Sequence, residues 1–352
     1  MVETTVKDRL RVIDAGAVGA LRSQSLWHGI ASAMVADSLP VLSLCQPREP
    51  YVSIGFHRSI DEIDREACAR FGLPVLRRQI GGGPVYIDGR QLFFQISLPS
   101  HRAPARVDRL YTELLAPAVQ AFRALGIEAR LRGSNDIAIA DRRLSGTGAG
   151  RIGDGVTVVG NVIFRFDHAR MVEVLALPTE TMRRECGRLM RRHVSSLEAQ
   201  GVGGVTFDDA KAALVAAYSR GLGLAVMEDR PTSVEEQEIA HWQTRLESEA
   251  WRAGAATGGR RPARVGRQVK ICAGVWVFAA RTGELDIQIS VIDGRLEKVM
   301  LAGASLNGKA ASMRQVLLEL PAEAGGVSER LAGFGVAGRR VADLLIPGLA
   351  LP

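Results

Sequence analysis

The stretch RRQIGGGPVYIDG, residues 77–89, decides the fold of this chain. Three consecutive glycines, Gly81, Gly82 and Gly83, separate two apolar runs with the composition of β-strands. Glycine costs backbone entropy and packs nothing, so a folded protein keeps such a triplet where φ must be positive or where a ligand approaches the main chain. We therefore expect a strand, a glycine loop whose N–H groups form an anion-binding concavity, and a second strand.

Two arginines stand directly before this loop. Arg77 and Arg78 carry planar guanidinium groups, which suit phosphate or carboxylate oxygens. A glycine-rich hairpin with two solvated arginines is the alternative, and spacing alone does not separate the two. The string lacks the Gly-Lys-Ser/Thr ending of a Walker loop and is not a dinucleotide fingerprint.

A second motif of polar and small residues lies at 133–150, GSNDIAIADRRLSGTGAG, and its pattern predicts two short strands around a tight turn near Asp141. Asn and Asp side chains can bind ribose hydroxyls, amides or a phosphate-bound Mg²⁺. The candidate ligand-binding residues are Asn135, Asp136, Ser145, Gly146 and Thr147. A plainer interpretation stays open here, in which the first two cap a turn and 145–148 fill a loop.

Outward from these motifs, the chain alternates between strand and helix patterns. Strands are expected within 39–56, 74–99 and 156–167, and helices within 61–73, 105–127, 167–177, 178–190 and 205–223.

The segment 252–267 is rich in Gly, Ala and Arg and has no apolar period, which indicates a linker. After it, KICAGVWVFAA, GELDIQISVIDG and RLEKVMLAG have strand patterns, and ASMRQVLLEL and VSERLAGF have helix patterns. We therefore predict a large domain at 1–255, a linker at 256–265 and a small α+β domain at 266–352.

Composition narrows the class of protein. The net charge is +7, but only five of the 45 basic residues are lysines, and a basic surface suits an acidic protein partner or a nucleotide as well as nucleic acid. No apolar run approaches the ~20 residues that span a bilayer, and the N-terminal sequence lacks a secretory pattern. Four scattered cysteines form no CxxC pair, which fits a reducing cytoplasm. We expect a cytoplasmic protein that binds neither membrane nor nucleic acid.

Taken together and in this order, the motifs resemble those of lipoate–protein ligases, in the biotin/lipoate protein ligase superfamily. RRQIGGGPVYIDG resembles the family's arginine pair, glycine triplet and Val-Tyr/Phe-His-Asp sequence, and NDIAIADRRLSGTGA resembles its Asn-Asp hairpin and Ser-Gly-Ser/Thr-Ala sequence. PYVSIGFHRSIDEID, LMRRHVSSLEA and QISVIDGRLEKVMLAG extend the resemblance to nearly the whole chain. It implies an α+β fold, with a class II synthetase-like mixed-sheet catalytic domain and a small C-terminal α+β accessory domain.

The resemblance also implies a two-step reaction. ATP, with Mg²⁺, and lipoate or octanoate give an acyl-adenylate, and a lysine ε-amine of a lipoyl carrier domain or a glycine-cleavage H-like protein then attacks it. Backbone amides and Arg78 would hold phosphate or carbonyl oxygens, Asp136 is a candidate Mg²⁺ ligand, and Leu76, Val85 and Phe93 are candidates for an aliphatic slot. The implied substrate- and adenylate-binding residues are Arg77, Arg78, Gly81, Gly82, Gly83, Val85, Tyr86, Asp88, Asn135, Asp136, Ser145, Gly146 and Thr147.

Three positions depart from the family pattern. The family's lysine falls on Arg143, its histidine on Ile87, and its His-His-Gly element on VVG at 158–160. In the family the lysine contacts the acyl carbonyl and α-phosphate oxygens. Arg143 keeps the charge but is not a compact point donor, and no lysine lies between Lys7 and Lys211. Arg143 is therefore the candidate catalytic residue.

Three functions remain open. The first is an active ligase in which Arg143 replaces the lysine electrostatically, and the second is a catalytically silent protein that binds a lipoate- or biotin-like ligand or an adenylate as a partner subunit or sensor. The third is an ATP-independent octanoyl or lipoyl transferase. Relatives that use a cysteine thioester place it just upstream of Asn-Asp, where this chain has no cysteine. Cys186 lies among arginines, which can lower a thiol pKa, but a buried structural cysteine is the favoured interpretation.

Overall fold

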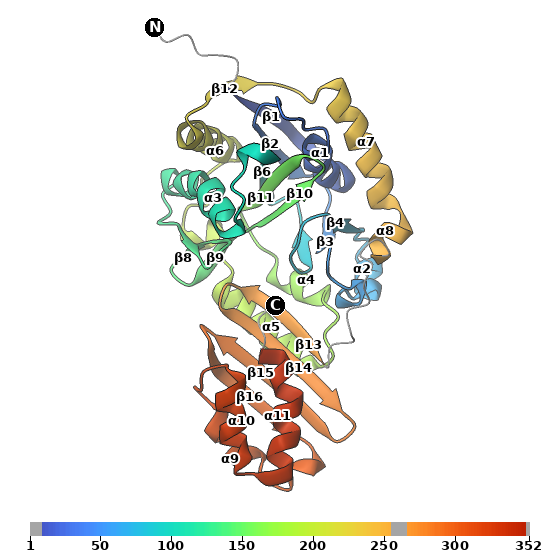
Figure 1. The fold of residues 1–352 in the computed structure, drawn as a ribbon, viewed down its shortest axis with the longest axis vertical. Helices are drawn as coiled ribbons and strands as arrows, with labels where there is room; N and C mark the ends of the chain where they lie inside the picture. The colour runs from blue at the N-terminus through green and yellow to red at the C-terminus, as the bar shows by residue number, and fades with distance from the viewer. Residues whose placement is uncertain (1–8, 255–265, 350–352) are drawn as a thin grey trace. The chain divides into compact units, whose positions relative to one another are not determined.

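The computed structural model describes residues 9–254 and 266–349, which form two compact units (Figure 1). Of these, residues up to Ala176 and from Val194 to Gly254 form the first unit. The second unit combines Leu177–His193 with the residues from Gly266 onward. The predicted linker at 256–265 lies outside the described residues.

A six-stranded mixed sheet forms the centre of the first unit, in the order β10-β11-β6-β2-β1-β12. β1 pairs in parallel with β2 and β12, and the other neighbours are antiparallel. The strands are β1 (Arg9–Val18), β2 (Val41–Pro47), β6 (Gln91–Pro99), β10 (Gly148–Ile152), β11 (Gly155–Ile163) and β12 (Ala225–Glu228).

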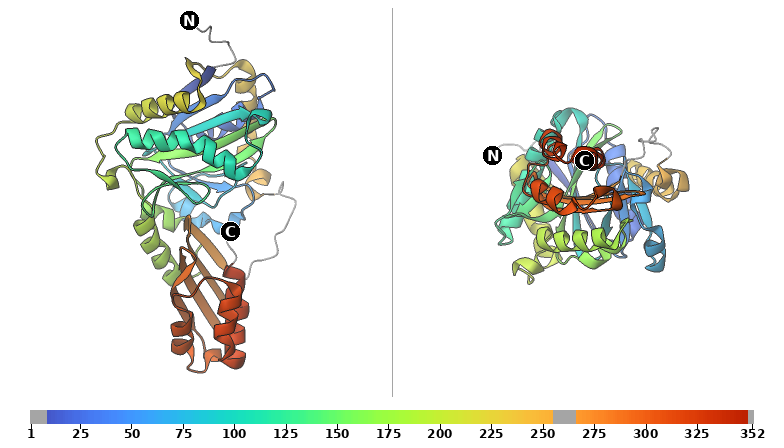
Figure 2. Two further views of the ribbon diagram at one scale, coloured as in Figure 1. Left: turned by 60° about the vertical axis from the view of Figure 1, so that its left-hand side comes forward. Right: turned by 90° about the horizontal axis from the view of Figure 1, so that it is seen from below.

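Helices cover both faces of this sheet (Figures 1 and 2). On one face, Phe94 of the sheet shares a core with residues of α3 (Val107–Ala124) and α6 (Phe207–Leu222). On the other, Ile13 shares a core with residues of α1 (Ala20–Ser32) and α7 (Ser233–Glu247). The alternation of side chains along each strand produces these two separate cores.

Two three-stranded sheets carry the motifs. The first, in the order β4-β3-β5, consists of β3 (Tyr51–Gly55), β4 (Val75–Arg78) and β5 (Val85–Ile87). The second, in the order β7-β8-β9, consists of β7 (Arg130–Arg132), β8 (Asp136–Ile139) and β9 (Arg142–Gly146). The strand, glycine loop and strand expected within 74–99 are confirmed, and so is the hairpin near Asp141. Short helices complete the unit: α2 (Arg65–Arg70), α4 (His168–Glu173), α8 (Glu249–Ala253) and the 3₁₀ turns Ile60–Glu62, Ser100–Arg102 and Glu198–Gln200.

The second unit is an antiparallel meander, β13-β14-β15-β16, with helices on both faces. Trp276, Ile289 and Leu345 belong to the core between the sheet and the three C-terminal helices. On the other face, α5 packs against β13 and β14. The elements are β13 (Arg267–Cys272), β14 (Val275–Thr282), β15 (Leu285–Ile292), β16 (Arg295–Ala302), the 3₁₀ turn Ala304–Leu306, α5 (Glu180–His193), α9 (Ala310–Leu317), α10 (Ala324–Ala332) and α11 (Gly335–Leu349).

The strand and helix patterns predicted for this unit are found, but α11 was not predicted. Within residues 9–254 and 266–349, no helix combines the length and the apolar character that a membrane span requires.

Candidate active site

The glycine loop between β4 and β5 is held by Arg78, which is buried. Its Nε and Nη2 donate to the carbonyl of Gly81 at 3.1 and 2.8 Å, and Nη2 also donates to Gly83 O at 2.9 Å. Its Nη1 donates to Ser53 O at 3.0 Å. Burial lowers the pKa of Arg78 to about 10, so the group stays charged at neutral pH. Arg78, predicted to hold ligand oxygens, binds carbonyl oxygens of the loop itself.

Gly82 shows why this loop is glycine. Its φ is +98°, and a Cβ there would lie 2.6 Å from Arg78 Nη2. Any side chain would therefore both strain the backbone and displace the guanidinium that shapes the loop.

Arg77 also donates hydrogen bonds to backbone carbonyls, in this case those of a neighbouring segment. Its Nη1 donates to three carbonyls of residues 55–58, the shortest bond being 2.7 Å to Arg58 O. Its Nε donates to Arg252 O at 3.0 Å, and its own carbonyl accepts from Trp251 Nε1 at 2.8 Å. Burial lowers the pKa of Arg77. Arg77 thus ties the strand before the loop to the end of α8.

His28, which the sequence did not single out, positions the start of the loop. Its Nε2 lies 3.0 Å from Gln79 N, and its Nδ1 lies 2.6 Å from Gln24 O. A backbone N–H only donates, so Nε2 accepts and Nδ1 carries the proton toward the carbonyl. Burial lowers the pKa of His28 to about 3, and its ring packs against Trp27 and Trp242, with centroids 3.6 and 4.6 Å away. A lone histidine in a helix gives no sequence signal for this role.

Ile80 joins the two motifs. A Cβ on Gly148 would lie 2.7 Å from Ile80 Cδ1, and one on Gly150 would lie 2.8 Å from Ile80 Cγ2. These two glycines of β10 therefore leave the space that the Ile80 side chain fills. β10, which includes the last residues of the second motif, therefore lies directly against the loop of the first.

The small residues of the second motif bond to one another and to β11. Asn135 Nδ2 donates to Thr147 O at 3.4 Å, and Thr147 Oγ1 donates to Asn135 O. Asn161 Oδ1 accepts from Gly146 N at 3.0 Å and from Ser145 Oγ at 3.2 Å. Asn161 is a further site residue that the sequence reasoning missed, although a buried polar residue in an apolar strand is a detectable signal.

Arg143 forms an ion pair with Asp136. Arg143 Nε and Nη2 each donate to one carboxylate oxygen at 3.0 Å, and Asp136 is only 1% exposed. In the part of the chain that the structure describes, no three His, Cys, Asp or Glu residues gather in a way that could hold a metal ion. Both carboxylate oxygens of Asp136 already accept hydrogen bonds.

The residues around β5 divide between surface and core. Val85 is exposed, whereas Tyr86 and Ile87 are buried, and burial raises the pKa of Tyr86. Leu76 and Ile87 share a small core, with Phe93 packed against it. Asp88 is buried, and its Oδ1 accepts from the N–H two residues further on at 3.0 Å.

Cys45, Cys68, Cys186 and Cys272 are all buried free thiols. Burial raises the pKa of Cys45 and Cys186 to about 12 and that of Cys68 to about 11. Cys186 is buried, as the favoured interpretation of the sequence expected.

This architecture is that of lipoate–protein ligases. The bipartite lipoate protein ligase of Thermoplasma acidophilum superposes with a TM-score of 0.64 at 22% identity, over 73% of this chain and 99% of that one, which confirms the predicted α+β fold. Residues 26–219 match the lipoyl protein ligase A/B catalytic domain, so the chain belongs to that family.

The chain is similar to curated octanoyltransferases and to curated lipoate–protein ligases. The octanoyltransferase LipM of Geobacillus kaustophilus is 24% identical over 231 residues, which are 57% of this chain and 82% of that protein. The lipoate-protein ligase LplJ of Bacillus subtilis is 35% identical over 99 residues, 28% of this chain and 29% of that protein. The curated relatives of this chain thus include both ligases and transferases.

Proposed function

We propose that this protein attaches a lipoyl or octanoyl group to a lysine of a lipoyl carrier domain through an acyl-adenylate formed from ATP. The packing of Ile80 against Gly148 and Gly150 carries this proposal, because it brings the glycine loop against β10. This strand begins directly after the Ser-Gly-Thr segment, residues 145–147. A glycine loop offers main-chain N–H groups to an anionic ligand without side chains in the way. Two reactants held there react as an oriented pair rather than by chance encounter.

Each motif has a part in this reaction. The backbone of Gly81, Gly82 and Gly83 would bind phosphate oxygens, and Arg78 and His28 would position that backbone. Arg143 would supply positive charge where negative charge develops on the acyl carbonyl and α-phosphate. Its Nε and Nη2 donate to Asp136. Its Nη1 has no hydrogen-bond acceptor among the described residues and would donate to a ligand oxygen. Val85, the exposed residue at the start of β5, would contact the acyl chain.

The arrangement of Asp136 does not fit the expected role of this residue as a Mg²⁺ ligand. Asp136, the predicted ligand, directs both carboxylate oxygens to Arg143. Mg²⁺ that accompanies ATP is usually held by one or two carboxylates together with the phosphates. The proposed reaction therefore assigns no metal ion to Asp136.

A second candidate function is that of a binding protein without turnover. The Arg143–Asp136 pair favours it, because a guanidinium held at two nitrogens is less able to follow a moving charge than the lysine of the family. An ATP-independent transferase is the third candidate, suggested by the similarity to octanoyltransferases. The raised pKa values of Cys45, Cys68 and Cys186 argue against a thioester route.

Pyrophosphate release separates these three functions. Full-length protein is given octanoate with ATP, lipoate with ATP, or an octanoylated carrier without ATP, each with an unmodified lipoyl domain. The ligase releases pyrophosphate only when an acid and ATP are both present. Modification of the lipoyl domain without ATP would establish the transferase instead. Binding of the acid without either product would establish the silent protein.

A further inference from the structure

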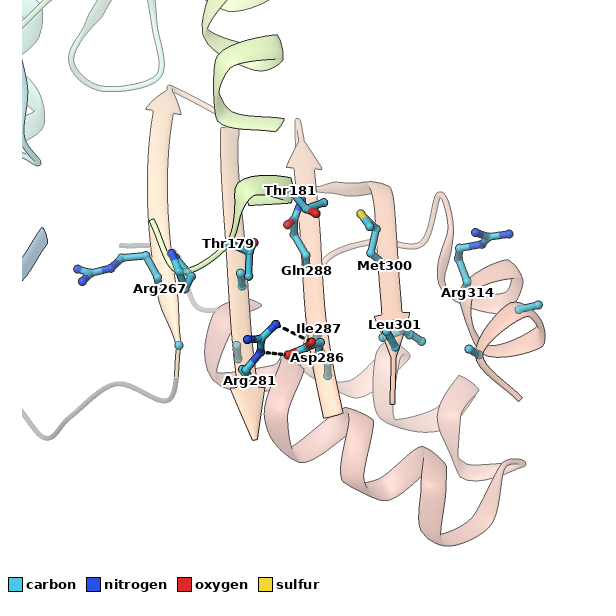
Figure 3. Close-up of a pocket in the computed structure, with 17 residues that line it drawn as sticks. Thr179, Thr181, Arg267, Arg281, Asp286, Ile287, Gln288, Met300, Leu301 and Arg314 are labelled. Atoms are coloured by element: carbon cyan, nitrogen blue, oxygen red, sulfur yellow. Dashed lines mark hydrogen bonds and ion pairs between the residues drawn. The ribbon is translucent and has the colours of Figure 1, made fainter. Parts of the chain in front are cut away.

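The second unit contains a trough on the sheet face that α5 covers only in part (Figure 3). α5 packs on β13 and β14, while the trough extends across β14, β15 and β16 to the start of α9. Its volume is about 760 Å³, which lies in the range of small-molecule sites. All of its lining residues belong to the second unit, so it is formed without the glycine loop.

Much of the trough surface is apolar and made of small side chains. Ala279, Ala302 and Ala310 line it, and Met300 is 38% exposed there. Alanines leave room above the sheet, and the unbranched methionine side chain adapts to an irregular apolar partner. This surface suits an aliphatic chain.

A buried hydrogen-bond donor lines the same trough. Gln288 on β15 is only 6% exposed, and its Nε2 has no hydrogen-bond partner among the described residues. Thr181, at the beginning of α5, lines the same trough (Figure 3). A buried amide nitrogen without a partner is costly, and it can only donate. It therefore calls for a ligand with an acceptor oxygen.

The charges around the trough favour an anionic acceptor. Asp286 accepts from Arg281, with Nη2 and Oδ2 2.9 Å apart, so this pair is neutral as a whole. Arg314 of α9 lines the trough and is exposed. The lining thus combines surplus positive charge, an unused donor and apolar alanines.

We propose that this trough binds an aliphatic carboxylate, whose carboxylate accepts from Gln288 Nε2 and whose chain lies along Met300, Ala279 and Ala302. The site is separate in sequence from the glycine loop, so the inference goes beyond the proposed reaction and does not depend on it.

Photolabelling of the full-length protein tests this site directly. The probe is decanoate with a diazirine at the end of its chain, and peptide mass spectrometry locates the label. Labelling is expected on the peptides that contain Met300 and residues 310–314. Excess decanoate should compete with the label, and decanol, which lacks the carboxylate, should compete at least about tenfold less well.

Two variants and one control separate a ligand site from a packing defect. Gln288→Leu removes the donor and should reduce labelling about tenfold or more. Ala302→Trp, at an exposed position, fills the trough and should abolish it. Ala302→Ser is the matched control and should label like the native protein.

Three results would overturn the proposal. The first is label found only outside the trough peptides, as on residues 79–89. The second is equal labelling of native protein and Ala302→Trp. The third is a Gln288→Leu protein that melts higher but labels unchanged, which would make the unpaired amide a packing defect only. Because the label is located by peptide, none of these results depends on whether the protein forms an adenylate.

Discussion

Arg143 binds both carboxylate oxygens of Asp136, with Nε–Oδ1 and Nη2–Oδ2 distances of 3.0 Å. The two residues lie on the neighbouring strands β8 and β9, and a register shift in that pairing falls between Ile137 and Ala138. A lysine has one nitrogen and cannot form this paired contact. Arg143 therefore fixes the hairpin that carries the second motif.

Arg143→Ala should reduce both stability and turnover. It removes the two hydrogen bonds that Arg143 donates to the buried Asp136 carboxylate, which should lower the free energy of unfolding by roughly 3 kcal/mol in urea titrations. Turnover should fall at least about tenfold, whereas Arg143→Lys, which keeps the charge, should stay within about tenfold of native. Arg130→Ala, on β7 of the same sheet and exposed, is the control. Full turnover by Arg143→Ala protein would remove Arg143 from the reaction.

Gly150→Ala should disturb the contact between the two motifs. The added Cβ would meet Ile80 Cγ2 at 2.8 Å, so overpacking should cost about 1–3 kcal/mol of unfolding free energy. In an Ile80→Ala background the same change should cost less, and this coupling is measured by a double-mutant cycle. Gly146→Ala is the control, because a Cβ there meets nothing within 4 Å. Equal costs in both backgrounds would show that Ile80 is not what Gly150 accommodates.

His28→Phe should loosen the glycine loop. The ring is kept but the acceptor for Gln79 N is lost, so amide hydrogen exchange in peptides covering 79–84 should become faster. His28→Gln can still present an acceptor oxygen and should exchange more slowly than His28→Phe. Ile30→Val, in the same helix and buried away from the loop, lowers stability without this local effect. Unchanged exchange in His28→Phe would contradict the positioning role.

Glu185→Gln should change the acid stability of the second unit. Burial is the largest influence on Glu185 and would raise its pKa, but hydrogen bonds from Arg188, Lys298 and Ser290 together lower it from 4.5 to about 2. A carboxyl pKa lower in the folded than in the unfolded state stabilises above about pH 4.5, and this stabilisation is lost as pH falls toward 2. Glu185→Gln should therefore be less stable at neutral pH and show a flatter decline across that window.

Urea titrations from pH 7 to 2.5 measure this decline. Glu284→Gln, in the same unit and at an exposed position, is the control and should behave like the native protein. Parallel pH curves for Glu185→Gln and native protein would show that Glu185 does not have the lowered pKa.

Local signals predicted the elements that carry the site. The glycine triplet predicted a loop between β4 and β5, and the alternation at 133–150 predicted the β8–β9 hairpin, because turn residues and side-chain alternation act over a few residues. α11 was missed because Gly335, Gly338 and Pro347 weaken its helix pattern. Packing offsets this weak helix propensity, because Gly338 allows α11 to approach the carbonyl of Leu331 more closely than any larger residue would.

Long-range contacts could not be predicted from one sequence. His28 and Gln79 lie 51 residues apart, and only the folded chain brings the ring to the N–H group. The partners of Arg78 are mainly backbone carbonyls, which every residue has, so no residue type indicates them. α5 was predicted as a helix, but its packing against β13 and β14 depends on strands about 80 residues further along the chain.

The mass of an unmodified lipoyl domain, measured after incubation with the full-length protein and octanoate, tests the proposed function most directly. With ATP present, we predict that the domain gains one octanoyl group on its acceptor lysine. The same mixture without ATP, and one containing a lysine-to-arginine acceptor, should show no gain. No gain with ATP under conditions in which octanoate binds, or a gain from an octanoylated carrier without ATP, would contradict the proposal that this chain works through an acyl-adenylate.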